Sequence, residues 1–190
     1  MKNTQRHIEI MDTTLRDGEQ MSGVSFSASE KLTIAQLLLN EVKVDRIEIA
    51  SARVSEGEFQ AVKKITGWAA ENGFLDKVEV LTFVDGYTSV NWMVESGAKV
   101  MNLLTKGSLN HLTHQLKKKP KEHFTDVAKV IALANEKGIS CNIYLEDWSN
   151  GMRNSKEYVL QYIDFLATQP IKRVLLPDTL GILIPSETFA

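Results

Sequence analysis

The densest group of side chains that could do chemistry lies in Asp12–Gln20, which reads DTTLRDGEQ and follows an apolar run. It contains four ionisable groups and two hydroxyls. Carboxylates and a guanidinium held together are groups that transfer protons and stabilise developing charge in active sites. The plain alternative is a solvated loop in which Arg16 and Asp17 form a surface ion pair of small energetic value. This alternative weakens because Gly18 allows a tight turn directly after the pair, and because other predicted strand ends also carry acids.

Two further carboxylates, Glu48 and Glu146, belong to predicted strands. Glu48 lies between two isoleucines, so strand alternation turns it to the opposite face, where a buried unpaired carboxylate is costly. Arg16 on the adjacent strand is its predicted partner, and this pair could be structural, could position a catalytic arginine, or could do both. Glu146 follows the fifth predicted strand and fits a functional or a structural role equally well. The neighbouring Asp147 is interpreted as an exposed loop acid.

Polar side chains also stand in the fourth and sixth predicted strand units. Asn102 and Thr105 are candidates for positions that face inward or towards the mouth of a site. Asp178 and Thr179 follow the sixth strand in the segment PDTLG, where they could simply form a turn. They contribute to a site only if the other strand ends converge nearby.

The histidines and lysines of the fourth unit carry weaker signals. His111 and His114 are spaced to share a helix face, but no acid stands at a suitable spacing, so we interpret them as loop or surface residues rather than metal ligands. A substrate contact stays open for one of them. Lys106 and the run Lys117–Lys119 are expected to be solvated, with contact to a phosphorylated cofactor as the alternative.

The elements that must position these residues alternate between short β-rich runs and longer amphipathic segments. Strands are predicted at Ile8–Thr13, Arg46–Ser51, Val78–Val84, Lys99–Leu104, Ile139–Leu145 and Lys172–Leu176. Helices are predicted at Ala28–Val42, Glu56–Asn72, Ser89–Ser96, Lys121–Lys137 and Ser155–Thr168. Ser27 and Glu30 form the S-x-x-E pattern of a capping box, and Gly73, Gly97 and Gly138 stand where helices are expected to end. Strict βα alternation indicates parallel strands joined by right-handed crossovers.

Two architectures fit that alternation, an open doubly wound sheet and a (β/α)₈ TIM barrel. Central strands of an open sheet are buried on both faces and read as continuous apolar runs. In the fifth predicted strand, however, apolar residues at positions 141, 143 and 145 alternate with polar ones at 142, 144 and 146. One face that packs on helices and one that carries polar groups towards the strand end favours the α/β barrel, whose active site lies at that end.

The strand count is smaller than a full barrel requires. About six βα units are visible in residues 1–190, and the last residues read as the opening of a sixth helix with Ser186 as its N-cap. No linker or low-complexity tract divides the chain. We therefore expect one domain, residues 1–190, that is the N-terminal part of a catalytic barrel and lacks strands seven and eight.

The composition is that of an ordinary globular protein, with 43% hydrophobic and 24% charged residues. The net charge of −2 argues against a nucleic-acid or anionic-membrane partner. No apolar run approaches the roughly 20 residues that cross a bilayer, and the N-terminus lacks the apolar core of a signal peptide. The lone Cys141 excludes an internal disulfide and fits the reducing cytoplasm, where we expect the protein to be. We interpret this cysteine as a small buried residue rather than a nucleophile.

Three segments together resemble the DRE-type metal-dependent barrel family, within the HMG-CoA lyase-like superfamily, that contains 2-isopropylmalate and citramalate synthases. Asp12–Gln20 is similar to the family's first-strand motif, and Ile47–Ile49 resembles its second element. Pro177–Gly181 is similar to the P-D-T-x-G motif that follows strand six in condensing members. The three segments stand in the family's order and span nearly the whole chain.

The resemblance implies a divalent metal (Mg²⁺, Mn²⁺ or Zn²⁺) bound by Asp17 and by two histidines of an H-x-H on strand seven, a motif that the 190 residues do not contain. Such a metal chelates the carboxylate and ketone oxygens of a 2-oxo acid and polarises the ketone as a Lewis acid. One carboxylate plus two imidazoles leaves coordination positions open for that chelate.

The resemblance also implies roles for the other candidates. Arg16 matches the family's catalytic arginine, which stabilises negative charge on the reacting oxygen, and Glu48 matches the acid that completes the motif triad. Glu146 stands where the synthases carry a glutamate near the acyl group. Thr179 matches a threonine that contacts the 2-oxo acid, and we expect Asn102 to be a second substrate-binding residue.

The implied reaction joins the co-substrate acetyl-CoA to a 2-oxo acid, 2-oxoisovalerate or pyruvate, in branched-chain amino-acid biosynthesis. Asp17 favours these synthases over homocitrate synthases, which usually carry glutamate there, and Glu19-Gln20 departs from the R-D-G-L-Q-N-E pattern of the lyase branch. A retro-aldol acyl-CoA lyase on the same barrel and a truncated, non-catalytic relative stay open as alternatives. We expect residues 1–190 alone to be inactive and the full-length protein to be a homodimer.

Overall fold

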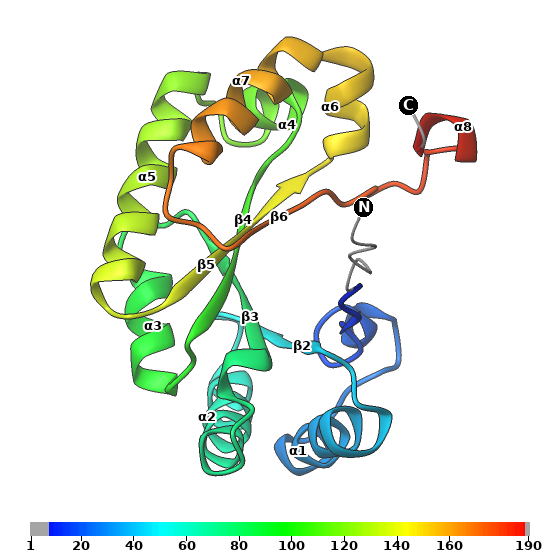
Figure 1. The fold of residues 1–190 in the computed structure, drawn as a ribbon, viewed down its shortest axis with the longest axis vertical. Coiled ribbons are helices and arrows are strands. Elements are labelled where there is room, and N and C mark those ends of the chain that lie inside the picture. Colours follow the sequence, from blue (N-terminus) through cyan, green and yellow to red (C-terminus); the bar gives the residue numbers. More distant parts are fainter. Residues whose placement is uncertain (1–7, 189–190) are drawn as a thin grey trace, which may run out of the picture.

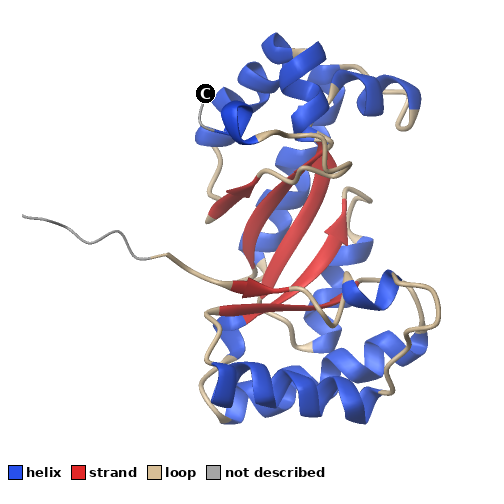
Figure 2. Ribbon diagram, turned by 90° about the vertical axis from the view of Figure 1, so that its right-hand side faces the viewer, coloured by secondary structure: helices blue, strands red, loops and turns tan. Residues whose placement is uncertain are grey.

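Six parallel strands follow one another across the sheet in the order of the chain in the computed structural model, which describes residues 8–188 (Figure 1). The strands are β1 Met11–Asp12, β2 Arg46–Ser51, β3 Val78–Phe83, β4 Val100–Lys106, β5 Ser140–Glu146 and β6 Arg173–Leu175. A doubly wound sheet reverses its strand order at a switch point, whereas a TIM barrel keeps the order of the chain. The strand order, together with the curled shape of the sheet in Figure 2, therefore confirms an α/β fold with six strands of a TIM barrel.

Helices lie along the outer side of this sheet (Figure 2). The longer ones are α1 Ala28–Leu37, continued by a π-helical turn at Leu38–Val42, α2 Glu56–Glu71, α3 Thr88–Ser96, α5 Pro120–Glu136 and α7 Lys156–Ala167. The short helices are α4 Leu109–His114, α6 Trp148–Asn154 and α8 Pro185–Thr188, and 3₁₀ turns occur at Gly18–Gln20 and Leu75–Lys77. Among residues 8–188, none of these helices combines the length and the apolar character that a bilayer crossing requires.

The helix boundaries follow the predicted signals closely. The Ser27 side chain accepts from the Glu30 N–H, and Glu30 accepts in turn from the Ser27 N–H, so the capping box is confirmed. Gly73, Gly97 and Gly138 all adopt positive φ. The prediction of Ser186 as an N-cap is wrong, because α8 begins one residue earlier at Pro185, where the fixed φ of proline suits the first helical position.

The outer face of the sheet forms the apolar core with the helices. Its strand residues are almost completely buried: Ile47, Ile49, Val78, Val80, Met101, Leu103, Cys141, Ile143 and Leu145. These residues occupy alternate positions of their strands, as predicted for the second and fifth strands. Burial raises the pKa of the Cys141 thiol to about 12, so Cys141 is a small core residue, as predicted, and its thiol is not a nucleophile at neutral pH.

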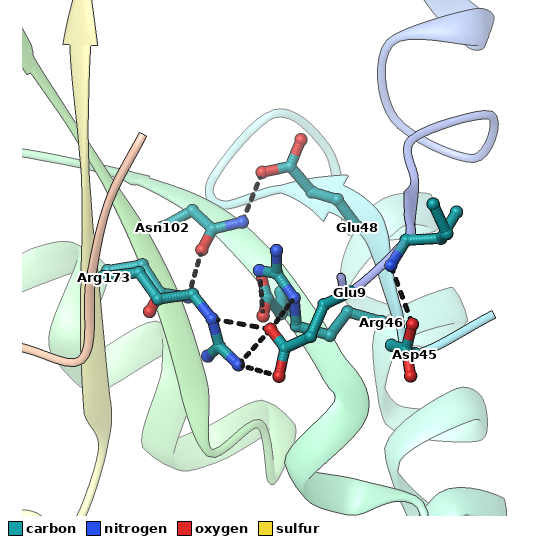
Figure 3. A network of polar contacts seen from close by, with 9 residues as sticks. Glu9, Asp45, Arg46, Glu48, Asn102 and Arg173 are labelled. Carbon is teal, nitrogen blue, oxygen red and sulfur yellow. Dashed lines mark hydrogen bonds and ion pairs between the residues drawn. The ribbon is translucent and has the colours of Figure 1, made fainter. Parts of the chain in front are cut away.

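The inner face of the sheet is polar, and at the N-terminal ends of the strands it carries an ion-pair network (Figure 3). Glu9 Oε2 lies 2.5 Å from Arg173 Nη2 and 3.3 Å from Arg46 Nε, and Arg46 Nη1 lies 3.0 Å from Glu79 Oε1. Arg173 beside Glu9 holds the pKa of that carboxyl below its usual value. The network joins the two edges of the sheet, because Glu9 precedes β1 and Arg173 opens β6.

The edge strands are shorter than predicted. Pairing covers only Met11–Asp12 of the predicted Ile8–Thr13 and only Arg173–Leu175 of Lys172–Leu176. Within residues 8–188, each edge strand has a neighbour on one side only, so fewer ladder bonds fix its ends. Apolar side chains are exposed at both edges, with Ile10 57% and Leu176 47% accessible.

We predict that a polypeptide of residues 1–190, expressed by itself, associates in solution, because unpaired apolar sheet edges template strand pairing. Light scattering over a range of concentrations should show particles larger than the monomer. Double replacement of the edge residues, Ile10→Lys and Leu176→Lys, should reduce this association, since lysine on an edge strand blocks pairing. A monodisperse monomer at every concentration would contradict the prediction.

Candidate active site

A cavity of about 440 Å³ opens at the C-terminal ends of the strands, the end at which TIM-barrel enzymes carry their active sites. It is lined by Arg16, Asp17, Gln20, Leu81, Leu104, Tyr144, Glu146, Pro177, Asp178 and Thr179. Four of the predicted site residues, from the loop after β1, the last position of β5 and the segment after β6, therefore meet in one cavity. A second cavity of about 620 Å³ lies between the loop after β1 and the first turns of α1 and α2, and it also reaches Arg16.

Arg16 begins a chain of polar contacts that crosses the inner face of the sheet. Its Nε lies 2.5 Å from Glu48 Oε2, as predicted, and the other Glu48 oxygen accepts from Asn102 Nδ2 at 2.7 Å. Asn102 Oδ1 in turn accepts from Asn142 Nδ2 at 2.9 Å. Glu48, Asn102 and Asn142 are fully buried, so this chain (seen in part in Figure 3) fixes the arginine from below.

The charge state of the Arg16–Glu48 pair reflects a balance of burial and attraction. Burial raises the pKa of Glu48, and Arg16 and Asn102 offset part of that rise. Burial disfavours the charge of Arg16, but Glu48 and Asp17 more than compensate and raise its pKa. Arg16 therefore remains a cation at the edge of the cavity, where it can attract an anionic substrate oxygen.

Asn102 itself lies one layer below the cavity. It is fully buried and both of its amide atoms are bonded, to Glu48 and Asn142. Asn102 is not one of the described residues that line the cavity. The geometry places Asn102 as a support of Glu48, which does not favour the predicted contact with substrate.

Asp17 is exposed, with 57% of its side chain accessible, and its carboxylate lies 2.6 Å from Arg16 Nη1. An exposed carboxylate at a cavity rim is suited to bind a cation. Residues 8–188 contain no group of three histidines, cysteines or acids that could hold a metal ion. By themselves the described residues therefore do not make a metal site of three such side chains.

Glu146 ends β5 and is paired with a lysine. Its carboxylate forms an ion pair with Lys106, the residue opposite it in the β4–β5 register, and Lys106 also donates to Gln115 Oε1 at 2.9 Å. Only 12% of the Lys106 side chain is accessible, so the prediction that Lys106 is solvated is wrong. The parallel register brings both residues to the same face and holds Glu146 at the cavity wall.

Thr179 and Asp178 fix the loop after β6 over the cavity. Thr179 Oγ1 accepts from the Asp147 N–H at 2.9 Å and keeps its own proton for a substrate oxygen. Asp178 accepts from Ser149 Oγ at 2.5 Å and from the Ile182 and Leu183 N–H groups, and these bonds lower its pKa. Asp178 thus forms a turn, which was one of its two predicted roles.

The prediction that Asp147 is an exposed loop acid is wrong. Asp147 is 2% exposed, has a φ of 64° and precedes α6. It accepts from Ser108 Oγ at 2.6 Å and from Asn150 Nδ2 at 2.8 Å, and His111 Nε2 lies 3.4 Å away. His111 is accordingly half-buried against Asp147 rather than a surface residue. These bonds join α4 to α6 behind Thr179.

Three cavity residues were neither predicted site residues nor part of the motif segments Asp12–Gln20 and Pro177–Gly181: Leu81, Leu104 and Tyr144. Leu104 is paired with Tyr144 in the β4–β5 register, two positions beyond the Asn102–Asn142 pair, so strand parity alone could have identified both. Burial raises the pKa of Tyr144, with a further contribution from Glu48. The phenol is therefore protonated at neutral pH and can donate a hydrogen bond beside two apolar leucines.

Known proteins resemble the chain along almost its whole length. The HMGL-like family model matches residues 7–190. A putative (R)-citramalate synthase of Methanopyrus kandleri is 32% identical over 182 residues, which are 96% of this chain and 34% of that protein. A probable 2-isopropylmalate synthase of Ignicoccus hospitalis is 28% identical over 187 residues, 98% of this chain and 45% of that protein. The chain thus spans a third to a half of the length of these relatives.

Among solved structures, HMG-CoA lyase from Brucella melitensis superposes with a TM-score of 0.69 at 19% identity, covering 96% of this chain and 65% of the lyase. At that identity the likeness shows the fold alone. The match to the family model across residues 7–190 shows that the chain belongs to the HMGL-like family.

Proposed function

We propose that the protein is an acyl-CoA-condensing synthase of the 2-isopropylmalate or citramalate type, which joins acetyl-CoA to a 2-oxo acid. Residues 1–190 would form the N-terminal part of its catalytic barrel. The observation that carries the proposal is the convergence of Arg16, Asp17, Glu146 and Thr179 on one cavity at the C-terminal ends of the strands. The resemblance of the chain to a citramalate synthase and a 2-isopropylmalate synthase supports the same reading.

The polar groups of the cavity suit a 2-oxo acid. A guanidinium has five N–H donors, and the contacts of Arg16 with Glu48 and Asp17 use one from Nε and one from Nη1. The remaining donors can bind an anionic oxygen, and the Thr179 hydroxyl can donate to a second one. The side chains of Leu81, Leu104 and Tyr144 border the same space, so a short apolar substituent of the acid can pack against them.

In the proposed reaction, a base removes a proton from the methyl group of acetyl-CoA, and the resulting carbanion attacks the ketone carbon of the 2-oxo acid. The former ketone oxygen takes up a proton, and water then hydrolyses the thioester, which releases free coenzyme A. The Glu146 carboxylate lies in the cavity wall, where it would act on the acyl group. Arg16 would stabilise the negative charge that develops on the former ketone oxygen. A divalent metal, when bound, would polarise the ketone. Asp17 would be one of its ligands, and residues 8–188 do not contain a complete group of three acidic, histidine or cysteine ligands.

The experiment that tests the proposal is an assay of thiol release from acetyl-CoA by the full-length protein with Mg²⁺ or Mn²⁺. Pyruvate and 2-oxoisovalerate are supplied in separate reactions, and we expect release that depends on one of them. A matched reaction without a 2-oxo acid controls for simple thioester hydrolysis. Release that does not depend on any 2-oxo acid would refute the proposal, because it is simple thioester hydrolysis. Cleavage of 3-hydroxy-3-methylglutaryl-CoA in place of condensation would refute the proposal in favour of the lyase alternative.

A further inference from the structure

A buried lysine, Lys31 on α1, lies outside the cavity that holds the candidate residues. It is 0% exposed, which is rare for a lysine unless its charge is fully paired. Its Nζ lies 2.5 Å from Glu19 Oε2 and 2.5 Å from Glu58 Oε1, and it donates to the Leu15 carbonyl at 3.2 Å. These three acceptors match the three donors of an ammonium group.

Two of these three contacts are with residues of the β1–α1 loop, residues 13–27. These two residues lie on either side of Arg16 and Asp17 in the sequence. Leu15 directly precedes Arg16, and Glu19 follows Asp17 by two residues. Between them the chain turns tightly, since the Arg16, Asp17 and Gly18 N–H groups all donate to the Thr13 carbonyl at 2.7–3.3 Å. Lys31 therefore closes the loop onto α1 without contacting either member of the pair.

Glu19 extends the same connection to the far end of the loop. Its second oxygen accepts from the Phe26 N–H at 2.8 Å. Burial works against the charge of Glu19, but Lys31 and the Phe26 N–H hold its pKa below the usual value. One ionised carboxylate thus joins the start of the loop, its end and α1.

We propose that Lys31 is a positioning residue that holds Arg16 and Asp17 at the cavity by clamping the β1–α1 loop through Leu15 and Glu19. The inference rests on the proposed function insofar as it concerns substrate binding. A lysine that only stabilised the packing of α1 on α2 would act equally through Glu58, which lies on α2. The two carboxylates thus offer a matched pair, because both contact Lys31 at the same distance and only Glu19 belongs to the loop.

The test compares Glu19→Gln with Glu58→Gln in the full-length protein, with Glu71→Gln at the exposed end of α2 as a control for removal of a carboxylate charge. Three quantities are measured: the KM for the 2-oxo acid, the hydrogen-exchange rates of backbone amides in residues 16–20, and the melting temperature. We expect Glu19→Gln to raise the KM by about tenfold, which corresponds to about 1.4 kcal/mol, and to accelerate exchange in the loop. Glu58→Gln should lower the melting temperature about as much as Glu19→Gln does, while it leaves the KM and the exchange rates of the loop close to those of the wild-type protein.

A Lys31→Met variant should accelerate exchange in the loop more than Glu19→Gln does. If Lys31→Met does not fold, the comparison of Glu19→Gln with Glu58→Gln still tests the clamp. Equal changes in KM and in loop exchange for the two glutamine variants would overturn the clamp. Absence of any thiol release by the wild-type protein would refute the proposed function instead. In that case the exchange rates alone decide, and faster loop exchange in Glu19→Gln than in Glu58→Gln supports the clamp.

Discussion

Replacing Arg16 with methionine in the full-length protein is expected to lower kcat/KM by about a hundredfold to a thousandfold, the usual cost of removing one charge-stabilising donor. The physical reason is that Arg16 is the cation of the cavity wall, held there by Glu48 at 2.5 Å. The same change leaves Glu48 buried without its charged partner, and breaking a buried pair typically costs about 3–5 kcal/mol of stability. Steady-state kinetics and thermal unfolding measure the two effects separately.

The double variant Arg16→Met/Glu48→Gln is the matched control for this change. Glutamine retains the shape of Glu48 and can still accept from Asn102, while it needs no cation. The double variant should therefore lose less stability and less activity than the sum of the single variants. Strict additivity in the double-mutant cycle would count against coupling between Arg16 and Glu48.

The pH dependence of that cycle has a definite sign. Burial raises the pKa of Glu48 in the folded protein above the ordinary value of 4.5, and removing Arg16 takes away a contribution that lowers it. A carboxyl with a raised folded pKa stabilises the fold when protonated and loses that stabilisation as the pH rises through its pKa. The stability advantage of the double variant over Arg16→Met should therefore grow as the pH rises above 4.5. A constant difference between the two variants from pH 5 to pH 8 would contradict this assignment.

Replacing Asp17 with alanine is expected to abolish metal-dependent turnover and leave the fold almost unchanged. With 57% of the side chain accessible, little packing is lost. Loss of a group that merely supports a metal ligand already costs about 10- to 100-fold in metal affinity or activity, so loss of a ligand should cost more. The measurement is kcat as a function of Mg²⁺ or Mn²⁺ concentration, together with the melting temperature.

Asp76→Ala supplies the control for Asp17, because it removes an exposed carboxylate just before β3, at the opposite end of the strands. It should leave both activity and metal dependence unchanged. An Asp17→Ala variant that keeps full activity at limiting metal would show that Asp17 is not a ligand.

Local sequence patterns were sufficient to predict the role of a residue where that role follows from strand parity. Alternation with isoleucine turned Glu48 inward, and the cost of burying it alone identified Arg16 as its partner, which the 2.5 Å contact confirms. The same parity indicated the inner face of β5 and the apolar face of the core. Boundary signals such as the Ser27 capping box also held, because a cap involves only residues three positions apart.

Apart from the N-cap at Ser186, the errors occurred where a side chain's environment depends on other segments of the chain. Asp147 looked like a loop acid, but helices α4 and α6 cover it through Ser108 and Asn150. These helices contain only six and seven residues, too few for a clear helical period. Lys106 was misjudged because its ion pair with Glu146 depends on the β4–β5 register, which the sequence does not show. The Glu9–Arg173 contact spans 164 positions and has no local signal at all.

The central claim is that the cavity bordered by Arg16, Glu146 and Thr179 binds the 2-oxo acid. A crystal structure of the full-length protein with Mg²⁺ and either pyruvate or 2-oxoisovalerate tests it most directly. We predict that the acid lies in this cavity, with one oxygen within hydrogen-bond distance of Arg16 and another within reach of the Thr179 hydroxyl. An acid bound instead in the larger cavity between the β1–α1 loop and α2, with no ligand between Arg16 and Thr179, would contradict the account.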